Sequence, residues 1–316
     1  MTDANDSALI ALLRGTTLPW TDIASRVKAA GSAVAVMNTE LGHPDPRDDW
    51  GDDDVTPLEL FPQQPTPEQT QRLQAAHEEA VTLLDQWRKQ GLRFLSLLNS
   101  EYPQQLREIF DLPPFLFAQG TLVANDRGVS VIGSRLASHD GIEFAQHVSH
   151  MLVERHLTVI AGGAAGIDAA AHETAIKSGG RTVAFLGTGI TQRYPAQNAR
   201  LQNLIARHGA LFSQFWPDQQ PTKWTFPLRN ASMSGYGIAS IIVEAGEYSG
   251  TRIQARQAQA HGRPLIIRDT VVDHTKWASN LAGRPGVYVV QSVQDVSHVL
   301  DILQQQEQDL VSLLPV

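Results

Sequence analysis

The residues best suited to chemistry lie in two glycine-rich loops, each of which follows a short apolar run, at 129–132 and at 158–160. A buried strand that ends in a glycine turn and opens a helix presents backbone N–H groups and a helix N-terminus to an anion. Glycine allows close backbone approach or positive φ, and arginine offers a fork of donors that matches a phosphate. The loops therefore predict a phosphate site at Gly133, Ser134, Arg135, Gly162, Gly163 and Gly166.

Two other interpretations of these loops stay open. Tight turns beside a surface arginine would look the same, because many α/β proteins have glycines there and bind nothing. An enzyme would need a carboxylate aimed at a glycosidic or phosphate bond, and Asp168 and Glu244 are the candidates. Asp168 is also explained as a favourable charge early in a helix, and its pairing with His172 lacks a third metal ligand. We expect no catalytic residue, no metal and no cofactor.

The chain around the loops alternates apolar runs with helical stretches, which predicts strand and helix in turn. Strands are expected near 182–186, 210–212, 239–243, 264–267 and 287–290, and helices near 140–155, 166–178, 198–208, 250–261 and 293–304. Shorter strand, helix and strand segments precede them between 91 and 120. The expected fold class is α/β: an extended Rossmann-like, doubly wound, mostly parallel sheet, preceded by a small helical module.

Composition limits the class of protein. The chain has 316 residues, 42% of them hydrophobic, which is enough for one large or two modest cores. It contains no cysteine, so disulfides and thiolate chemistry are excluded. Met1 is followed by acidic and polar residues, and no apolar run approaches the length of a membrane span. We expect an unprocessed cytoplasmic protein with no membrane partner.

Four segments are predicted from local composition. They are a small helical module at 1–37, an acidic proline-rich linker at 38–67, the α/β domain at 68–305 and a tail at 306–316. Thr66, followed by a proline, is expected to start a helix that continues to about Lys89 and buries Trp87, and Thr21 is a candidate cap for the second helix of the module.

Charge is distributed unevenly. The net charge of −8 comes from residues 38–68, which hold nine acids and one arginine, whereas residues 129–290 hold fifteen Lys and Arg against ten Asp and Glu. A mildly basic domain permits a phosphate-binding face. The acidic stretch is either a plain linker or an arm that covers that face.

Several motifs resemble, in order and spacing, those of the DNA-processing protein A (DprA/Smf) family. The resemblance covers roughly residues 91–290. The motifs are Gly133-Ser134-Arg135, Gly166 to His172, Gly179 to Gly189, Tyr194-Pro195, Phe226 to Asn230, Glu244-Ala245 and Ser249-Gly250-Thr251. The winged-helix module that usually ends such chains is not recognised after residue 292.

The resemblance implies a protein without catalysis that binds single-stranded DNA, forms a homodimer and helps to load a RecA-type recombinase during natural transformation. It adds Arg229, Asn230, Ser249, Gly250 and Thr251 to the phosphate-binding residues. Arg135 and Arg229 are expected to be exposed contacts. Sequence-independent binding also needs stacking surfaces, for which the candidates are Tyr194, Trp224 and Phe226.

Three positions depart from the family pattern. Ala165 and Ala231 stand where cations are usual, and residues 266–270 replace a Pro-Gly loop, so that Arg268 is either a substitute cation or a surface residue. Because affinity for a single strand grows with the number of neutralised phosphates, the two alanines should weaken binding. Two alternatives therefore remain: a nucleotide-binding or nucleotide-hydrolysing sensor, with free N–H groups at a helix starting at Thr251, and a divergent regulator of a toxin or defence partner.

Overall fold

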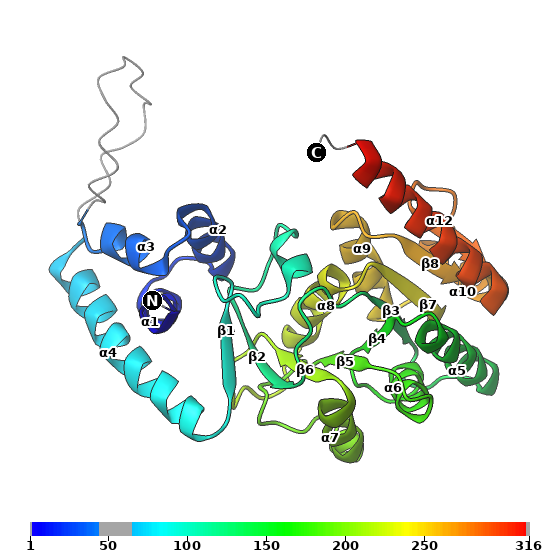
Figure 1. The fold of residues 1–316 in the computed structure, drawn as a ribbon, viewed down its shortest axis with the longest axis horizontal. Coiled ribbons are helices and arrows are strands. Elements are labelled where there is room, and N and C mark those ends of the chain that lie inside the picture. The colour runs from blue at the N-terminus through cyan, green and yellow to red at the C-terminus, as the bar shows by residue number, and fades with distance from the viewer. Residues whose placement is uncertain (1, 44–64, 314–316) are drawn as a thin grey trace. The chain divides into compact units, whose positions relative to one another are not determined.

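A computed structural model describes residues 2–43 and 65–313 of the chain. The chain divides into two compact units, Met1–Tyr102 with Leu112–Leu116, and Pro103–Asp111 with Phe117–Val316. Figure 1 shows their helices and strands in chain order by colour. Most of the acidic segment predicted at 38–67 lies outside the described residues, so its predicted role as a linker or arm is untested.

The first unit is built on helices. Its elements are α1 (Thr2–Gly15), α2 (Trp20–Ala30), α3 (Ala33–Glu40), α4 (Pro67–Lys89) and β1 (Arg93–Ser96). The start of α4 is confirmed: Thr66 accepts a hydrogen bond from the Gln69 N–H, and the Gln69 side chain accepts one from the Thr66 N–H. Trp87 is buried, as predicted. Thr21 does not cap α2, because that helix already begins at Trp20, after Pro19.

The strands of the second unit form one sheet of order β2-β6-β5-β4-β3-β7-β8-β9, to which β2 contributes from Phe117 onward. All neighbours from β6 to β9 pair in parallel, and β2 pairs with β6 antiparallel. These strands are β2 (Phe115–Gly120), β3 (Gly128–Gly133), β4 (Thr158–Ala161), β5 (Thr182–Phe185), β6 (Ala210–Ser213), β7 (Ala239–Glu244), β8 (Leu265–Arg268) and β9 (Val287–Val290). The predicted sheet is confirmed, with strand ends within about two residues of those expected.

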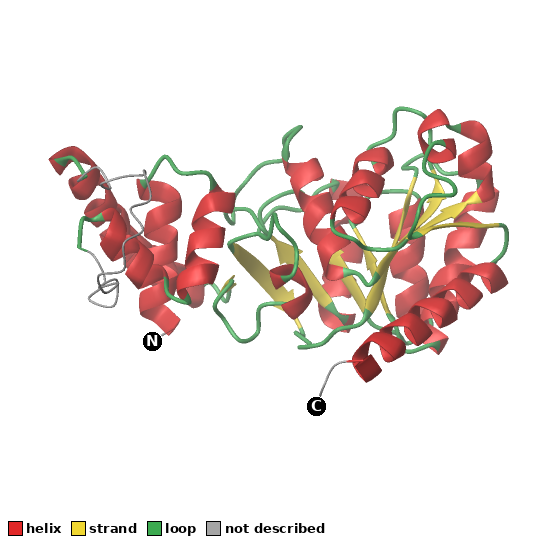
Figure 2. Ribbon diagram, turned by 90° about the horizontal axis from the view of Figure 1, so that it is seen from above, coloured by secondary structure: helices red, strands yellow, loops and turns green. Residues whose placement is uncertain are grey.

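Helices cover both faces of this sheet, as Figure 2 shows for the second unit. Alternate residues of β3 identify the two faces. Val129 and Val131 belong to an apolar core with α5, α6 and α12. Ser130 points the other way, and its hydroxyl donates to the Met233 carbonyl of α8, 3.3 Å away. The helices of the second unit are η2 (Gln104–Arg107), α5 (His139–Glu154), α6 (Ile167–Lys177), η3 (Ala196–Asn198), α7 (Ala199–His208), α8 (Thr225–Tyr236), α9 (Thr251–Ala260), α10 (Asp269–His274), α11 (Lys276–Ser279) and α12 (Val293–Leu313).

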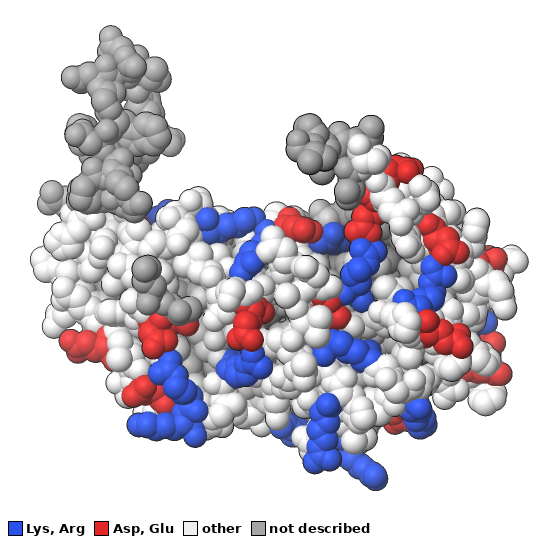
Figure 3. All heavy atoms as spheres, viewed as in Figure 1, with Lys and Arg blue, Asp and Glu red and all other residues white. Residues whose placement is uncertain are grey.

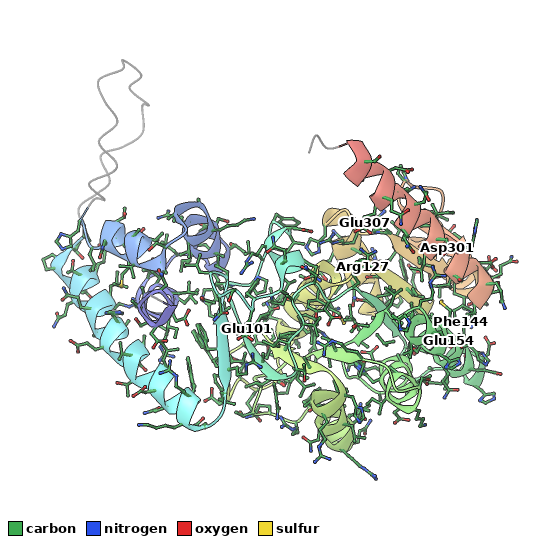
Figure 4. The ribbon with its side chains drawn as sticks, in the orientation of Figure 1. Glu101, Arg127, Phe144, Glu154, Asp301 and Glu307 are labelled. Atoms are coloured by element: carbon green, nitrogen blue, oxygen red, sulfur yellow. The ribbon has the colours of Figure 1, made fainter. Side chains whose placement is uncertain are left out.

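Some of these helices differ from the sequence prediction. Helices α8, α10 and α11 were not predicted, and α12, which was expected near 293–304, continues to Leu313. Arg127 forms an ion pair of 2.7 Å with Glu307 in the distal part of α12, and Arg155 pairs with Asp301, six residues earlier in that helix. Figure 4 labels Arg127, Glu307 and Asp301. No helix among the described residues is long and apolar enough to cross a membrane.

Candidate anion-binding site

The strand order reverses between β3 and β7, and ligands of open α/β sheets bind at such a point, outside the carboxyl ends of the strands. Gly133 at the end of β3 lies beside Glu244 at the end of β7. The Ser134 N–H donates to the Glu244 carbonyl over 2.8 Å, which holds the two ends together. A cavity of about 540 Å³ opens at this place.

The cavity brings together most of the residues predicted for the site. Gly133, Ser134, Arg135, Arg229, Asn230, Ser249, Gly250 and Thr251 all line it. Gly162, Gly163 and Gly166 do not line it, although Ala164 of the same loop does. Phe226 and Asp168 also line the cavity, but Tyr194 and Trp224 do not.

The second glycine loop supports the first. Gly166 has φ +75°, and a Cβ on it would lie 2.3 Å from the Ser134 carbonyl oxygen. The Ile167 N–H donates to the same oxygen over 3.2 Å. Only glycine allows this approach, so Gly166 shapes the loop at Ser134 and Arg135 without itself lining the cavity.

Arg229 is buried, contrary to the prediction of an exposed contact: its exposed fraction is 6%. Its guanidinium Nη1 donates to the Phe185 carbonyl over 2.9 Å, and its Nε has no hydrogen-bond partner within the described part of the chain. Gly162 leaves room for it, since a Cβ at 162 would lie 1.5 Å from Nη1. Burial lowers the pKa of Arg229, and the nearby charge of Asp168 raises it. The site thus holds a desolvated cation with one unused donor.

Asp168 is fixed by the loop in front of its helix. Its Oδ2 accepts hydrogen bonds from the N–H groups of Gly162, at 2.9 Å, and Ala164, at 3.3 Å. Burial raises the pKa of Asp168, while Arg229 and these two N–H groups lower it. The carboxylate therefore orders the loop and balances part of the charge of Arg229.

Glu244 is likewise held by structural bonds. Its carboxylate accepts from the Ser138 N–H at 3.1 Å and from the Ser138 hydroxyl at 2.5 Å, next to the start of α5. Ser138 is the N-cap of that helix and accepts from the Gly141 N–H. Because its acceptors serve this cap, Glu244 braces the end of β7 rather than facing a bond to be cleaved.

Arg135 is exposed and lies over an aromatic ring. Its guanidinium carbon is 5.4 Å from the centroid of Phe226, and Phe226 lies 5.8 Å from the ring of Tyr194. Tyr194 is 41% exposed. The three side chains form a row from a cation in the cavity to an accessible ring, an arrangement suited to a phosphate followed by a stacked base.

The start of α9 offers fewer donors than the sequence predicted. The Thr251 N–H donates to the Ser249 hydroxyl, and the N–H groups of the next three residues donate to the carbonyls of Ser249 and Gly250. The expectation of free N–H groups there is wrong, because the loop before the helix folds back and caps it. Gln254 replaces them: it lines the cavity at 2% exposure, and its Nε2 has no partner within the described residues.

Arg268 does not substitute for the missing cations. It pairs with Asp140 at 2.8 Å and lies 4.4 Å from the centroid of Phe144, on the face covered by α5. Ala165 is half-buried in the glycine loop, and Ala231 is buried on α8 at 5% exposure. Arg268 therefore does not supply the cavity with the positive charge that the family pattern has at positions 165 and 231.

A second group of residues has the Ser, His and Asp of a hydrolase, but a substrate cannot reach its serine. His261 contacts Asp111 through Nε2 at 2.7 Å and Ser234 through Nδ1 at 3.2 Å. Ser234 is fully buried, so no substrate carbonyl can reach its hydroxyl. The described residues also contain no group of three His, Cys, Asp or Glu that could hold a metal ion.

Comparison with known proteins gives one family. Residues 93–301 match the family model described as DNA recombination-mediator protein A. The chain is 34% identical over 186 residues to the DNA processing protein DprA of Bacillus subtilis, which covers 58% of this chain and 63% of that protein. It is 36% identical over 203 residues to DprA of Streptococcus pneumoniae, covering 64% and 72%. The match to the Bacillus subtilis protein thus spans less than two thirds of that protein's length.

Solved structures agree on the fold. The chain resembles the crystal structure of DprA from Streptococcus pneumoniae with a TM-score of 0.60 and 32% identity, covering 71% of this chain and 81% of that one. It resembles DprA from Helicobacter pylori with a TM-score of 0.58 and 21% identity, covering 69% and 96%. The extended Rossmann-like sheet around the cavity is therefore shared with both.

Proposed function

Because this chain belongs to the DNA recombination-mediator protein A (DprA/Smf) family, we propose that it binds single-stranded DNA in the cavity at the carboxyl ends of β3 and β7. Binding would be independent of base sequence and without catalysis. A relative from Helicobacter pylori is described as having a single-stranded DNA binding mode.

One observation carries this proposal: two buried donors without partners line the same cavity. They are the Nε of Arg229 and the Nε2 of Gln254, and both side chains are more than nine-tenths buried. Unpaired buried donors cost free energy, and an acceptor that enters the cavity would satisfy them. Phosphate oxygens are acceptors of this kind, and Arg135 adds an exposed positive charge.

The row from Arg135 through Phe226 to Tyr194 supports DNA over an isolated anion. Base stacking on aromatic rings together with phosphate contacts binds single strands without reading base edges. Tyr248 also lines the cavity with 97% of its surface exposed, so it is a further platform that the sequence analysis missed. Trp224 is 78% exposed but lies outside the cavity lining, and we assign it no role.

The wider role follows from the family. We propose that the protein acts in DNA processing and recombination, as a homodimer that helps a RecA-type recombinase onto single strands during natural transformation. This part of the proposal depends on family membership, whereas the cavity supports only the DNA-binding step.

The test is the affinity for a labelled oligo-dT at low salt, measured by fluorescence anisotropy as salt is raised. We expect the logarithm of affinity to fall linearly with the logarithm of salt concentration, by roughly 0.7 per phosphate contacted. A pocket for a free nucleotide is the competing function, because cavities of this size suit small ligands. Absence of oligo-dT binding, together with a melting temperature that rises with added nucleotide, would replace the DNA proposal with that one.

A further inference from the structure

We propose that a second cavity, on the flank of α9, binds phosphates of the same DNA strand after it leaves the first cavity. This inference rests on the proposed function. The second cavity has a volume of about 310 Å³, and its polar lining consists of Arg252, Arg256, Arg284, Asn280 and Gln259. Trp277 forms part of its wall.

The three arginines have no carboxylate partner within the described part of the chain. No ion pair involves Arg252, Arg256 or Arg284 among the described residues, and the cavity lining contains no carboxylate. Some other arginines of this unit do have one: Arg263 pairs with Glu108 and Arg268 pairs with Asp140. The cavity is therefore a local concentration of unbalanced positive charge.

The placement of two of these arginines costs stability unless an anion is present. Arg252 and Arg256 are four residues apart on α9 and both are exposed, so their charges face the same side of the helix. A like-charge pair at this spacing is destabilising in an isolated helix. On the face drawn in Figure 3, several Lys and Arg lie beside Asp or Glu.

Helix α9 joins the two cavities. Thr251 and Gln254 line the first, and Arg252 and Arg256 line the second, from neighbouring positions of the same helix. The residues from Thr251 to Arg256 span only about 8 Å along the helix axis, so one strand can contact both.

The loop before α9 is held from the wall of the second cavity. The Trp277 indole N–H donates to the Gly246 carbonyl over 3.3 Å, and the Lys276 N–H donates to the Glu247 carboxylate over 2.8 Å. Gly246 and Glu247 line the first cavity. The walls of the two cavities are thus in contact.

The chemistry of the second cavity favours a nucleic acid backbone over a protein partner. Arginine forks match phosphates, and the aromatic wall residue Trp277 is buried at 6% exposure, so it offers no anchor for an apolar side chain. Bases are not stacked there either, which makes the contact one of backbone charge alone. The second site should therefore depend on strand length and on salt, but not on base identity.

The experiment compares a short and a long oligo-dT on the full chain, the short one only a few nucleotides and the long one about 20. The variant R252Q/R256Q removes two charges and retains helix-forming side chains. We expect it to bind the short strand like the unmodified protein, to bind the long strand about tenfold more weakly, and to lose roughly 1.4 units of salt slope for two phosphate contacts. R284Q, on a separate loop, should lower affinity for the long strand in the same direction.

The matched control is K177Q/R207Q, which removes two exposed charges from the last turns of α6 and α7. These helices follow parallel strands, so their ends lie at the opposite edge of the sheet, and we expect no change at either length. Equal affinity of R252Q/R256Q and R284Q with the unmodified protein for the long strand would overturn the inference and leave the proposed function standing. If those variants lost only the binding of a polyglutamate peptide, the site would belong to an acidic protein. Failure of the unmodified protein to bind either strand would overturn both.

Discussion

The guanidinium of Arg229 occupies the volume that a side chain at Gly162 would need. A Cβ at position 162 would lie 1.5 Å from Nη1 and 2.3 Å from Cζ of Arg229. Arg229 cannot simply swing aside, because the same Nη1 donates to the Phe185 carbonyl in a buried place. Glycine at 162 is thus the condition for a buried arginine in the wall of the cavity.

Replacing Gly162 with alanine should therefore displace Arg229. We expect G162A to lose about 1 to 3 kcal/mol of unfolding free energy, from the lost hydrogen bond and the disturbed charge, and to bind oligo-dT at least tenfold more weakly. G246A is the control, since a Cβ there meets nothing within 4 Å and Gly246 lines the same cavity. Urea unfolding and anisotropy measure the two effects, and a G162A protein that matches G246A in both would contradict this account.

Substitution of Arg135 and substitution of Arg229 should have different effects on the melting temperature. R135A removes an exposed group, so we expect about 1 to 3 kcal/mol less binding energy for oligo-dT and a nearly unchanged melting temperature. R229A removes a buried cation and leaves Asp168 with less compensation, so both affinity and melting temperature should fall. Equal melting temperatures for the two variants would show that the burial of Arg229 carries no energetic weight.

Much of the fold could be predicted because buried parallel strands are continuous apolar runs. Helix α8 was missed because its segment has no apolar periodicity: it begins with Thr225 and Phe226, has a proline at its third position and is otherwise rich in small and polar residues. Its helical state depends on packing against α9 and β3, which a local pattern does not contain.

The loop residues of the site could be predicted from the sequence, but its buried side chains could not. Arg229 was expected at the surface because arginines usually are, and only the neighbouring Gly162 makes room for its burial. Gln254 was missed because a neutral amide inside a helix carries no signal until its surroundings leave it without a partner. The role of Glu244 was likewise hidden, since its partner Ser138 lies 106 residues away in the chain.

His172 should make the protein sensitive to acid. It is fully buried, and burial, followed by the charge of Arg229, lowers its pKa to about 3 from 6.5. Between these values the unfolded chain binds the proton and the folded chain does not. The stability that the protein gains by keeping His172 neutral is therefore fully present above pH 6.5. As the pH falls below 6.5, the free energy of unfolding decreases by up to about 1.4 kcal/mol per pH unit.

The variant H172N tests this pH dependence. Its amide can donate to the Thr182 hydroxyl, as the His172 Nδ1 does across 2.7 Å, but it does not titrate. Urea unfolding at pH 7.5 and 5.5 should show a smaller loss of stability for H172N than for the unmodified protein. H147N, which changes an exposed histidine, should keep the full loss, and identical pH dependence in all three proteins would refute the assignment.

Asp6 should oppose folding of the first unit at neutral pH. It is 7% exposed, and burial raises its pKa to about 6 from 3.8. Because the pKa is raised, the neutral carboxyl of Asp6 stabilises the fold fully below pH 3.8. This stabilisation is lost as the pH rises through 6 and the buried carboxyl ionises. We expect D6N to raise the unfolding free energy at pH 7.5 by about 1 to 3 kcal/mol, whereas E78Q, at an exposed position of α4, should leave it within about 0.5 kcal/mol. A destabilised D6N protein at pH 7.5 would contradict the prediction.

Restoring the two cations that the family pattern leads one to expect should have different effects at the two positions. Ala165 is half-buried in the glycine loop, so an arginine there can reach solvent and the DNA backbone. Ala231 is 5% exposed on α8, beside the cavity residue Asn230, and a long cationic side chain would be forced into packed surroundings. We expect A165R to gain one phosphate contact, with roughly 0.7 units more salt slope, at little cost in stability.

A231R should instead lower the melting temperature, because burying an unpaired charge or overpacking a helix interface costs about 1 to 3 kcal/mol. A231Q, of similar length but neutral, separates the two causes: if it is as unstable as A231R, overpacking dominates, and if it is stable, the charge does. The double variant A165R/A231R should bind oligo-dT no more tightly than A165R at equal fraction folded. Tighter binding by the double variant, with an unchanged melting temperature, would show that position 231 still opens onto the DNA path.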